Sequence, residues 1–527
     1  MFKGHPKGLI PAALSNMGER FGYYIMNAVL LLFLCSKFGI SDSVAAVIYA
    51  VFYFGIYVFS LPGGLIADKT KNYKGTIMAG LFAMAAGYVM LSIPILATPE
   101  NNTLMLAFTC FALFVIAFGN GLFKGNLQAI VGQLYDNYEK EAEKTGDPAK
   151  IELAKSKRDP GFQIFYVFIN IGGVIAPFVA PYLRSWWLGK HGFEYNAQLP
   201  ELCHKYINEG VNMGAEAMAN MNELINKVVI DGNIPTDLAA FSQDYLKVFN
   251  EGVHYSFIAS VVAMLISLAI FFFYKRIFPN PQAATAEESA KEEAKYSAEE
   301  KAAMARDIKQ RMMGLYAVLA ICVFFWMSFH QNGQSLSLFA RDFVHTQSVP
   351  PEVWQFLNPF LVITLTPIIM WIFGTKWGRT VSTPKKIVMG MMFAGCAYLF
   401  LTCFSAYMGY PSGEAFRALD VTTQDGMKAS WLVLIVTYFF LTVAELFISP
   451  LGLSFVSKIA PKHLQGICQG LWLGATALGN LLILLGPIFY NELPSLWMCW
   501  LIFMIICFVA MMVMRGMLNW LERITNA

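Results

Sequence analysis

Charged side chains are scarce in this chain of 527 residues. Asp, Glu, Lys and Arg make up 14% of it, whereas 57% of the residues are hydrophobic, and the mean hydropathy is +0.51. Soluble globular domains carry about 25% charged residues, so the composition excludes an ordinary soluble fold. The net charge of +3 is too small to indicate a nucleic-acid partner.

Sequence motifs for catalysis and metal binding are also missing. The nine cysteines are scattered, mostly within apolar segments, and no C-x-x-C spacing occurs, so the sequence predicts neither a disulfide framework nor a cysteine metal site. Neither H-E-x-x-H nor G-x-S-x-G is present. We therefore expect that the protein is not an enzyme and that it has no metal or other cofactor.

Long apolar segments dominate what is present. In lipid, backbone polar groups must be satisfied within the segment, which leaves helices, because nothing here alternates like a barrel strand. The sequence therefore predicts an all-α integral membrane protein. Its 12 transmembrane helices centre on residues 14–38, 44–67, 75–97, 103–133, 161–187, 253–278, 311–340, 352–374, 385–408, 429–457, 464–488 and 494–518.

The connections between these segments predict the organisation of the chain. Residues 1–187 and 253–279 form an N-terminal six-helix half, and 311–527 form a C-terminal one. Residues 188–252 are polar and amphipathic, which indicates a long extracytoplasmic loop with short helices. Residues 280–310 have mixed charge and many alanines, typical of a solvated helical cytoplasmic linker.

The positive charges predict an orientation. Most of the 38 Lys and Arg residues lie in the two tails and in the connections after even-numbered segments. Because cytoplasmic loops are rich in Lys and Arg, both termini are expected in the cytoplasm. No organellar signal is evident and the start of the chain does not read as a signal peptide, so the default expectation is a multi-pass protein of the bacterial inner (plasma) membrane.

The first segment carries a polar face. At about 100° per residue, six residues of NMGERFGYYIMN fall on one side of a helix: Asn16, Glu19, Arg20, Tyr23, Tyr24 and Asn27. A charge at the centre of a membrane helix costs about 2.5–3.5 kcal/mol, so such charges usually face one another or a cavity. A Glu–Arg pair at the cytoplasmic mouth of the helix is the alternative.

Three further ionisable residues lie within apolar segments. Lys124 stands in GNGLFKGN, where it either faces a cavity or snorkels to the interface. Glu445 is surrounded by apolar or small residues, which is hard to explain without a cationic partner. His330 can change charge near physiological pH, or it can be a neutral hydrogen-bonded side chain between helices.

These motifs resemble those of a known family. Asn16-x-x-Glu19-Arg20-Phe21-x-Tyr23-Tyr24 resembles the ExxERFxYY signature of the proton-dependent oligopeptide transporters, a branch of the major facilitator superfamily. The string 119–126 resembles the family's G-x-G-x-x-K-P-N motif, with Gly in place of Pro, and 158–166 followed by 170–173 resembles its fifth-helix signature. The resemblance implies the major facilitator fold and proton-coupled peptide transport.

The charges suggest how a ligand is held. Arg20 and Lys124 lie in the first half and Glu445 in the second, so a zwitterion fits between them, its carboxylate toward the two cations and its amine toward Glu445. In the resembled family, this Glu meets the amino group of a bound peptide. Capturing both ends favours di- and tripeptides. The other candidate substrate-binding residues are Tyr23, Tyr24, Tyr57, Asn170, Trp326, Asn358 and Trp472.

Three positions depart from the family pattern, which commonly has Glu, Arg and a carboxylate where this chain has Asn16, Asn27 and His330. In relatives, the last two look like an ion pair that closes the outer gate. Replacing both avoids one uncompensated charge, so we expect a different but self-consistent gate. A second loop motif, GGLIADK at 63–69, resembles the superfamily's gating loop, in which Asp68 caps or pairs with a neighbouring helix end.

These departures leave two functions open. One is proton symport of di- or tripeptides, with Glu19 and His330 as proton carriers. The other is an uncoupled or differently coupled carrier of peptide-like or other small zwitterionic or anionic solutes on the same fold. A channel would need polar rings along an open pore, which a single asymmetric chain is poorly suited to form. The expected partners are the substrate, protons and the lipid bilayer, and the expected state is a monomer.

Overall fold

A computed structural model describes residues 4–98, 100–279, 298–346, 349–459 and 465–526. Among these residues, 12 helical segments are long and apolar enough to cross a membrane. The predicted fold class, an all-α protein with 12 transmembrane helices, is therefore confirmed. Residues 280–297 of the predicted linker lie outside the described residues.

The first six spans agree with the apolar segments, but two of the helices are longer. They are α1 (Leu9–Phe38), α2 (Asp42–Val58) continued by α3 (Ser60–Thr70), α4 (Tyr73–Ser92), α5 (Asn102–Lys144), α7 (Arg158–Lys190) and α10 (Leu238–Tyr274). α5 runs past the expected end at 133, and α10 begins inside the predicted loop. Hydropathy marks where a helix is apolar, whereas the helix itself continues into water as long as its polar residues allow. A short helix, α6 (Pro148–Ser156), precedes α7.

The last six spans include interrupted helices. They are α12 (Ala298–Phe329) with η2 (His330–Gly333) and α13 (Ser335–Phe343), η3 (Pro351–Phe356) with α14 (Leu357–Gly374), α16 (Thr383–Met408), α19 (Leu432–Ile459), α20 (Gln465–Leu482) with α21 (Leu485–Glu492), and α22 (Leu496–Gly516). Residues 298–310 of the predicted linker are thus the start of the helix that carries span seven.

Short elements fill the ends of the bundle. Between α7 and α10 lie α8 (Leu199–Glu209), η1 (Gly210–Met213) and α9 (Ala215–Val228). The second half adds α15 (Lys376–Thr380), α17 (Gly413–Arg417), α18 (Val421–Met427) and α23 (Leu518–Asn526). Two short strands, β1 (Val344–His345) and β2 (Ala429–Ser430), pair in parallel.

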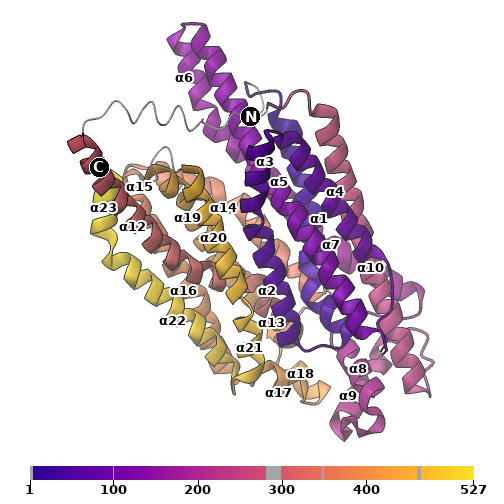
Figure 1. Cartoon of the computed structure of the whole chain (residues 1–527). Coiled ribbons are helices and arrows are strands. Elements are labelled where there is room, and N and C mark those ends of the chain that lie inside the picture. The colour runs from indigo at the N-terminus through magenta and orange to yellow at the C-terminus, as the bar shows by residue number, and fades with distance from the viewer. Residues whose placement is uncertain (1–3, 99, 280–297, 347–348, 460–464, 527) are drawn as a thin grey trace.

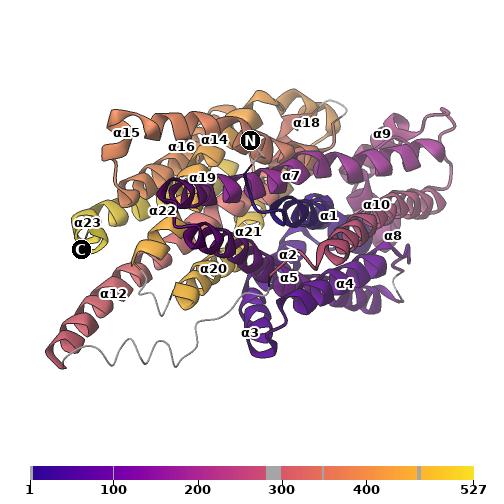
Figure 2. The same ribbon diagram turned by 90° about the horizontal axis from the view of Figure 1, so that it is seen from above.

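The two sets of six spans lie side by side (Figures 1 and 2). Both termini are at one end of the bundle, which we call the terminal face, and α8, α9, α17 and α18 are at the opposite end, the distal face. Glycines allow close approach within the first set. A Cβ on Gly80 of α4 would lie 2.6 Å from the carbonyl oxygen of Gly119 in α5, and one on Gly119 would lie 2.7 Å from that of Gly80, so Gly119 of the GNGLFKGN motif has a packing role.

Candidate substrate site and distal gate

Glu19 and Arg20 form a buried ion pair. The Arg20 guanidinium donates from Nε and Nη2 to the two Glu19 carboxylate oxygens at 2.5 and 2.6 Å. Asn120 of α5 donates to the same carboxylate at 2.6 Å. Glu19 is 0% and Arg20 7% exposed, so the pair is enclosed by protein and does not lie at an open mouth. Two charges within one low-dielectric site compensate each other.

The tyrosines predicted for the site lie near the two cations. The Lys124 ammonium lies 3.8 Å from the centre of the Tyr57 ring, and the Arg20 guanidinium lies 4.6 Å from that of Tyr23. Tyr23 in turn contacts Tyr24 edge-on at 5.3 Å. In the described ranges no carboxylate forms an ion pair with Lys124, and its ammonium contacts the ring face instead.

Glu445 of α19 is half-buried and is held by an amide. Asn358 of α14 donates to the Glu445 carboxylate at 2.8 Å and to Thr442 at 3.2 Å. The described part of the chain contains no Lys or Arg that pairs with Glu445. A carboxylate in this position, with one amide donor and no cation, can still accept a ligand ammonium. Two of the predicted site residues, Glu445 and Asn358, are thus brought together.

The remaining predicted site residues are placed as follows. Asn170 donates to the carbonyl oxygen of Tyr166 in its own helix at 3.0 Å, so part of its amide is already engaged. Trp326 and Trp472 are buried, with 6% and 3% of their surfaces exposed. Trp326 stacks on the His330 ring at 5.1 Å between ring centres.

The two replaced gate positions do not bond each other. Asn27 accepts hydrogen bonds from the hydroxyls of Tyr23 and Tyr49 at 3.1 and 2.9 Å. His330, where span seven breaks into η2, contacts Tyr53 edge-on at 5.0 Å. Since Tyr49 and Tyr53 also contact each other at 5.7 Å, an aromatic chain on α2 connects the two positions.

Two other predicted gating residues lie away from this chain. Asn16 is buried, 6% exposed, near the start of α1. Asp68 is exposed at the end of α3 and accepts a hydrogen bond from the Tyr73 hydroxyl, at the first residue of α4. This contact links neighbouring helices on the terminal face, within one half of the chain.

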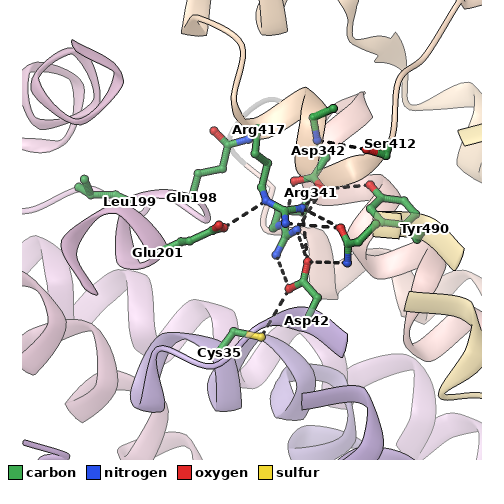
Figure 3. Close-up of polar contacts among 12 residues, drawn as sticks. Cys35, Asp42, Gln198, Leu199, Glu201, Arg341, Asp342, Ser412, Arg417 and Tyr490 are labelled. Carbon is green, nitrogen blue, oxygen red and sulfur yellow. Dashed lines mark hydrogen bonds and ion pairs between the residues drawn. The ribbon is translucent and has the colours of Figure 1, made fainter. Parts of the chain in front are cut away.

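A dense ion-pair network lies at the distal face, and it was not predicted (Figure 3). Arg341 of α13 donates to both carboxylate oxygens of Asp42, at the start of α2, at 3.0 and 2.9 Å. Arg341 also pairs with Asp342 at 2.8 Å. Arg417 of α17 reaches three acids: Asp42 at 3.3 Å, Asp342 at 3.1 Å and Glu201 of α8 at 3.1 Å. The network therefore joins both sets of spans.

The surroundings of Arg417 keep it charged. Burial disfavours the cation, but the Asp42 carboxylate favours it, and the net effect raises the Arg417 pKa above its ordinary value. A second ion pair crosses between the two sets of spans: Arg184 of α7 donates to Glu352 of η3 at 2.8 Å, and the two residues are 1% and 0% exposed. We call the Asp42–Arg341–Asp342–Arg417 cluster and the Arg184–Glu352 pair together the distal gate.

Comparison with known proteins assigns the fold and the motifs to one family. The model of the POT family matches residues 74–291 and 282–494. The chain belongs to the POT family. This confirms the resemblance to the proton-dependent oligopeptide transporters, a family of transporters, and agrees with a multi-pass membrane protein.

Relatives of this POT-family chain cover most of its length. It is 28% identical over 507 residues to peptide transporter YePEPT of Yersinia enterocolitica subsp. palearctica serotype O:3, and the match covers 91% of this chain and 87% of that relative. It is 26% identical over 482 residues to dipeptide and tripeptide permease B of Yersinia enterocolitica serotype O:8, covering 89% and 83%.

Solved structures share the fold. A POT family transporter in complex with a thioalcohol-conjugated peptide has a TM-score of 0.69 at 19% identity, covering 99% of this chain and 98% of that one. Peptide transporter POT in complex with sulfate has a TM-score of 0.67 at 20% identity, covering 100% and 96%. At these identities the likeness shows the fold alone.

The distal gate of this POT-family chain left only a weak signal in the sequence. Asp42, Arg341 and Glu352 stand at the ends of apolar segments, where flanking charges are expected simply because they face water. Arg417 lies in a connection that carries several other charges. What distinguishes these residues is burial against an opposite charge, which depends on helices far apart in the sequence.

Proposed function

We propose that this chain imports di- and tripeptides by alternating access between its first and last six spans. The observation that carries the proposal is the division of charge. Arg20 and Lys124 belong to α1 and α5, whereas Glu445 belongs to α19 and has no cationic partner among the described residues. A zwitterion that bridges the two sets would bind both at once, as a carrier requires.

The state of Arg20 supports proton coupling. Its guanidinium fork is occupied by Glu19, and the same fork is what a peptide carboxylate would need. Protonation of Glu19 would remove the competing charge and free Arg20 for the substrate. In this scheme Glu19 is the main proton carrier and His330 a second one.

The two relatives are a peptide transporter and a dipeptide and tripeptide permease by name, which supports the substrate class. The distribution of Lys and Arg supports cytoplasmic termini, so the distal face is extracytoplasmic and the distal gate is the outer gate. We propose a monomer in the bacterial inner membrane, because one chain supplies both halves of the site.

The decisive test is uptake of labelled Ala-Ala into proteoliposomes, with and without an imposed inward proton gradient. Glu445→Gln keeps the hydrogen bond from Asn358 but removes the charge that faces the peptide amine. A charge-assisted hydrogen bond contributes about 1.5–3 kcal/mol, so uptake at low peptide concentration should fall about 10- to 100-fold. Glu492→Gln, at an exposed residue at the end of α21, is the matched control.

The outcomes separate the candidates. Accumulation driven by the gradient and lost in Glu445→Gln supports peptide symport. Uptake that only equilibrates and ignores the gradient supports the second candidate, an uncoupled carrier, which the replacement of family charges by Asn16, Asn27 and His330 favours. A Glu445→Gln variant that accumulates Ala-Ala as wild type does would refute the role of Glu445.

A further inference from the structure

The segment between α7 and α10 is attached firmly to the first set of spans. We call residues 191–237 the distal cap. Its two ends pair through backbone hydrogen bonds, from Glu194 to Val228 at 2.7 Å and from Ile230 to Gly192 at 3.0 Å. The ring of His204 contacts the Ser36 carbonyl oxygen of α1 at 2.7 Å. The distal cap therefore moves with the first half.

The same cap reaches across to the second set of spans. Its polar contacts there fall on α17, on α18 and on the residues between them. The contacts are Glu201 to Arg417 at 3.1 Å, Gln198 to Gln424 at 3.0 Å, Asn220 to the Leu419 carbonyl oxygen at 2.8 Å, and Lys227 to Asp425 at 3.5 Å. Asn220 is 4% exposed, so its bond is shielded from water.

The interface is built so that it can separate. A cavity of about 560 Å³ lies between the cap and the second half, lined by Phe193, Asn196 and Ile230 on one side and by Val344 and Val421 on the other. The polar contacts thus surround a cavity, and across a cavity there are no packing contacts to break when the two surfaces separate.

An ion pair at Arg417 connects the distal cap to the distal gate. Its contacts to Asp42 and Asp342 already belong to the distal gate, and Glu201 adds a third carboxylate from a segment that is not a membrane span (Figure 3). The cap therefore contacts the same cation that closes the gate.

We propose that the distal cap is a clamp: its contacts with residues 417–425 hold the distal gate closed, and they must break each time the gate opens. The inference rests on the proposed alternating access. If two halves rock against each other, contacts made only in the distal-closed state shift the equilibrium toward that state.

A native cysteine reports the opening of the gate. Cys35, at the distal end of α1, is partly buried and donates to Asp42 at 3.5 Å. We would measure the rate at which a membrane-impermeant maleimide modifies Cys35 in the purified full-length protein, following the Cys35 peptide by mass spectrometry. In detergent both faces are accessible, so the result does not depend on orientation.

The test variant is Glu201→Gln/Asn220→Ala, which removes one ionic and one neutral contact of the clamp. Glu209→Gln/Asn222→Ala makes the same changes at exposed positions of the same helices, α8 and α9, and is the matched control. The sum of one exposed ion pair and one buried hydrogen bond predicts Cys35 modification about 3- to 50-fold faster than in wild type. The control should stay within about twofold.

Two further variants separate gate opening from local effects. Asn220→Ala alone changes no charge near the thiol and should still accelerate modification. Glu201→Gln should add nothing in an Arg417→Gln background, because its partner is already gone. Equal rates in the test and control variants, with both folded by thermal unfolding, would overturn the clamp.

The outcome is independent of the substrate. Faster Cys35 modification in a protein that transports no Ala-Ala would retain the clamp and reject the peptide proposal. Normal Ala-Ala uptake with unchanged Cys35 modification would retain the transporter and reject the clamp.

Discussion

Neutralising one partner of the Arg184–Glu352 pair should open the distal gate. The two side chains are almost fully buried and join α7 to η3 at 2.8 Å and, through the second nitrogen and oxygen, at 3.4 Å. The Arg184 guanidinium also lies 4.0 Å from the centre of the Tyr195 ring, in the distal cap. Glu352→Gln keeps the shape of the side chain but leaves the Arg184 charge buried without a counter-charge.

The size of the effect follows from burial. Removing one partner of a buried ion pair costs about 3–5 kcal/mol. The cost applies only while the distal side is closed, since Arg184 is hydrated once the halves separate. Each 1.4 kcal/mol is tenfold in an equilibrium constant, so the ratio of distal-open to distal-closed protein should rise by about 10²- to 4 × 10³-fold as an upper bound.

The assay is Cys35 modification together with thermal unfolding in detergent. Glu352→Gln should accelerate modification, and Arg184→Gln/Glu352→Gln should return most of the way toward wild type, because no charge is then left unpaired. Glu414→Gln, at an exposed residue of α17, is the control. If the single and double variants accelerate modification equally, the stranded charge is not the cause and the reasoning fails.

Three further predictions concern packing, hydrogen bonding and pH. Gly63→Ala would place a Cβ 2.3 Å from a backbone carbonyl of α5, so it should lower stability to thermal unfolding by about 1–3 kcal/mol, whereas Gly64→Ala, with open space around it, should not; equal unfolding temperatures would contradict this. Asn120→Ala removes a donor to the buried Glu19 and should cost about 1–3 kcal/mol by the same assay, and an unchanged transition would show that this bond contributes nothing. Burial opposes ionisation of Asp425, yet its lysine partners lower its pKa below the ordinary value. The stabilisation that the Asp425 carboxylate gives to the closed state is therefore complete above about pH 4, and it is lost as the pH falls through the lowered pKa. The ratio of Cys35 modification rates in Asp425→Asn and wild type should therefore stay constant from pH 5 to 8. A ratio that changes across this range would refute the lowered pKa of Asp425.

Much of the fold was accessible from the sequence because lipid imposes a simple rule. Every backbone group in the bilayer must be bonded within its own helix, so a run of about 20 apolar residues identifies a span without knowledge of its neighbours. The ends of the helices were harder to predict from the sequence. α10 begins at Leu238 because a helix can continue through polar residues such as Gln243 and Asp244, which carry no hydropathy signal.

The candidate site likewise has a part that the sequence predicts and a part that it does not. Glu19, Arg20, Lys124 and Glu445 stand out in the sequence because a charge in an apolar segment is costly wherever it is finally placed. Their roles in binding and coupling remain predictions. What the sequence could not supply is which groups meet: that Asn120 holds Glu19, or that Asn358 holds Glu445.

The sequence by itself thus determined the membrane class, the 12 spans and the family, since each depends on local composition or on a short motif. Only the tertiary structure decided the contacts on which the proposed distal gate and clamp rest. Asp42, Arg341 and Arg417 are ordinary charges in the sequence, and they form the proposed gate because three distant segments bring them within 3.3 Å of a partner in a largely buried place. Coulomb attraction depends on distance and on the local dielectric, and both are properties of the folded chain.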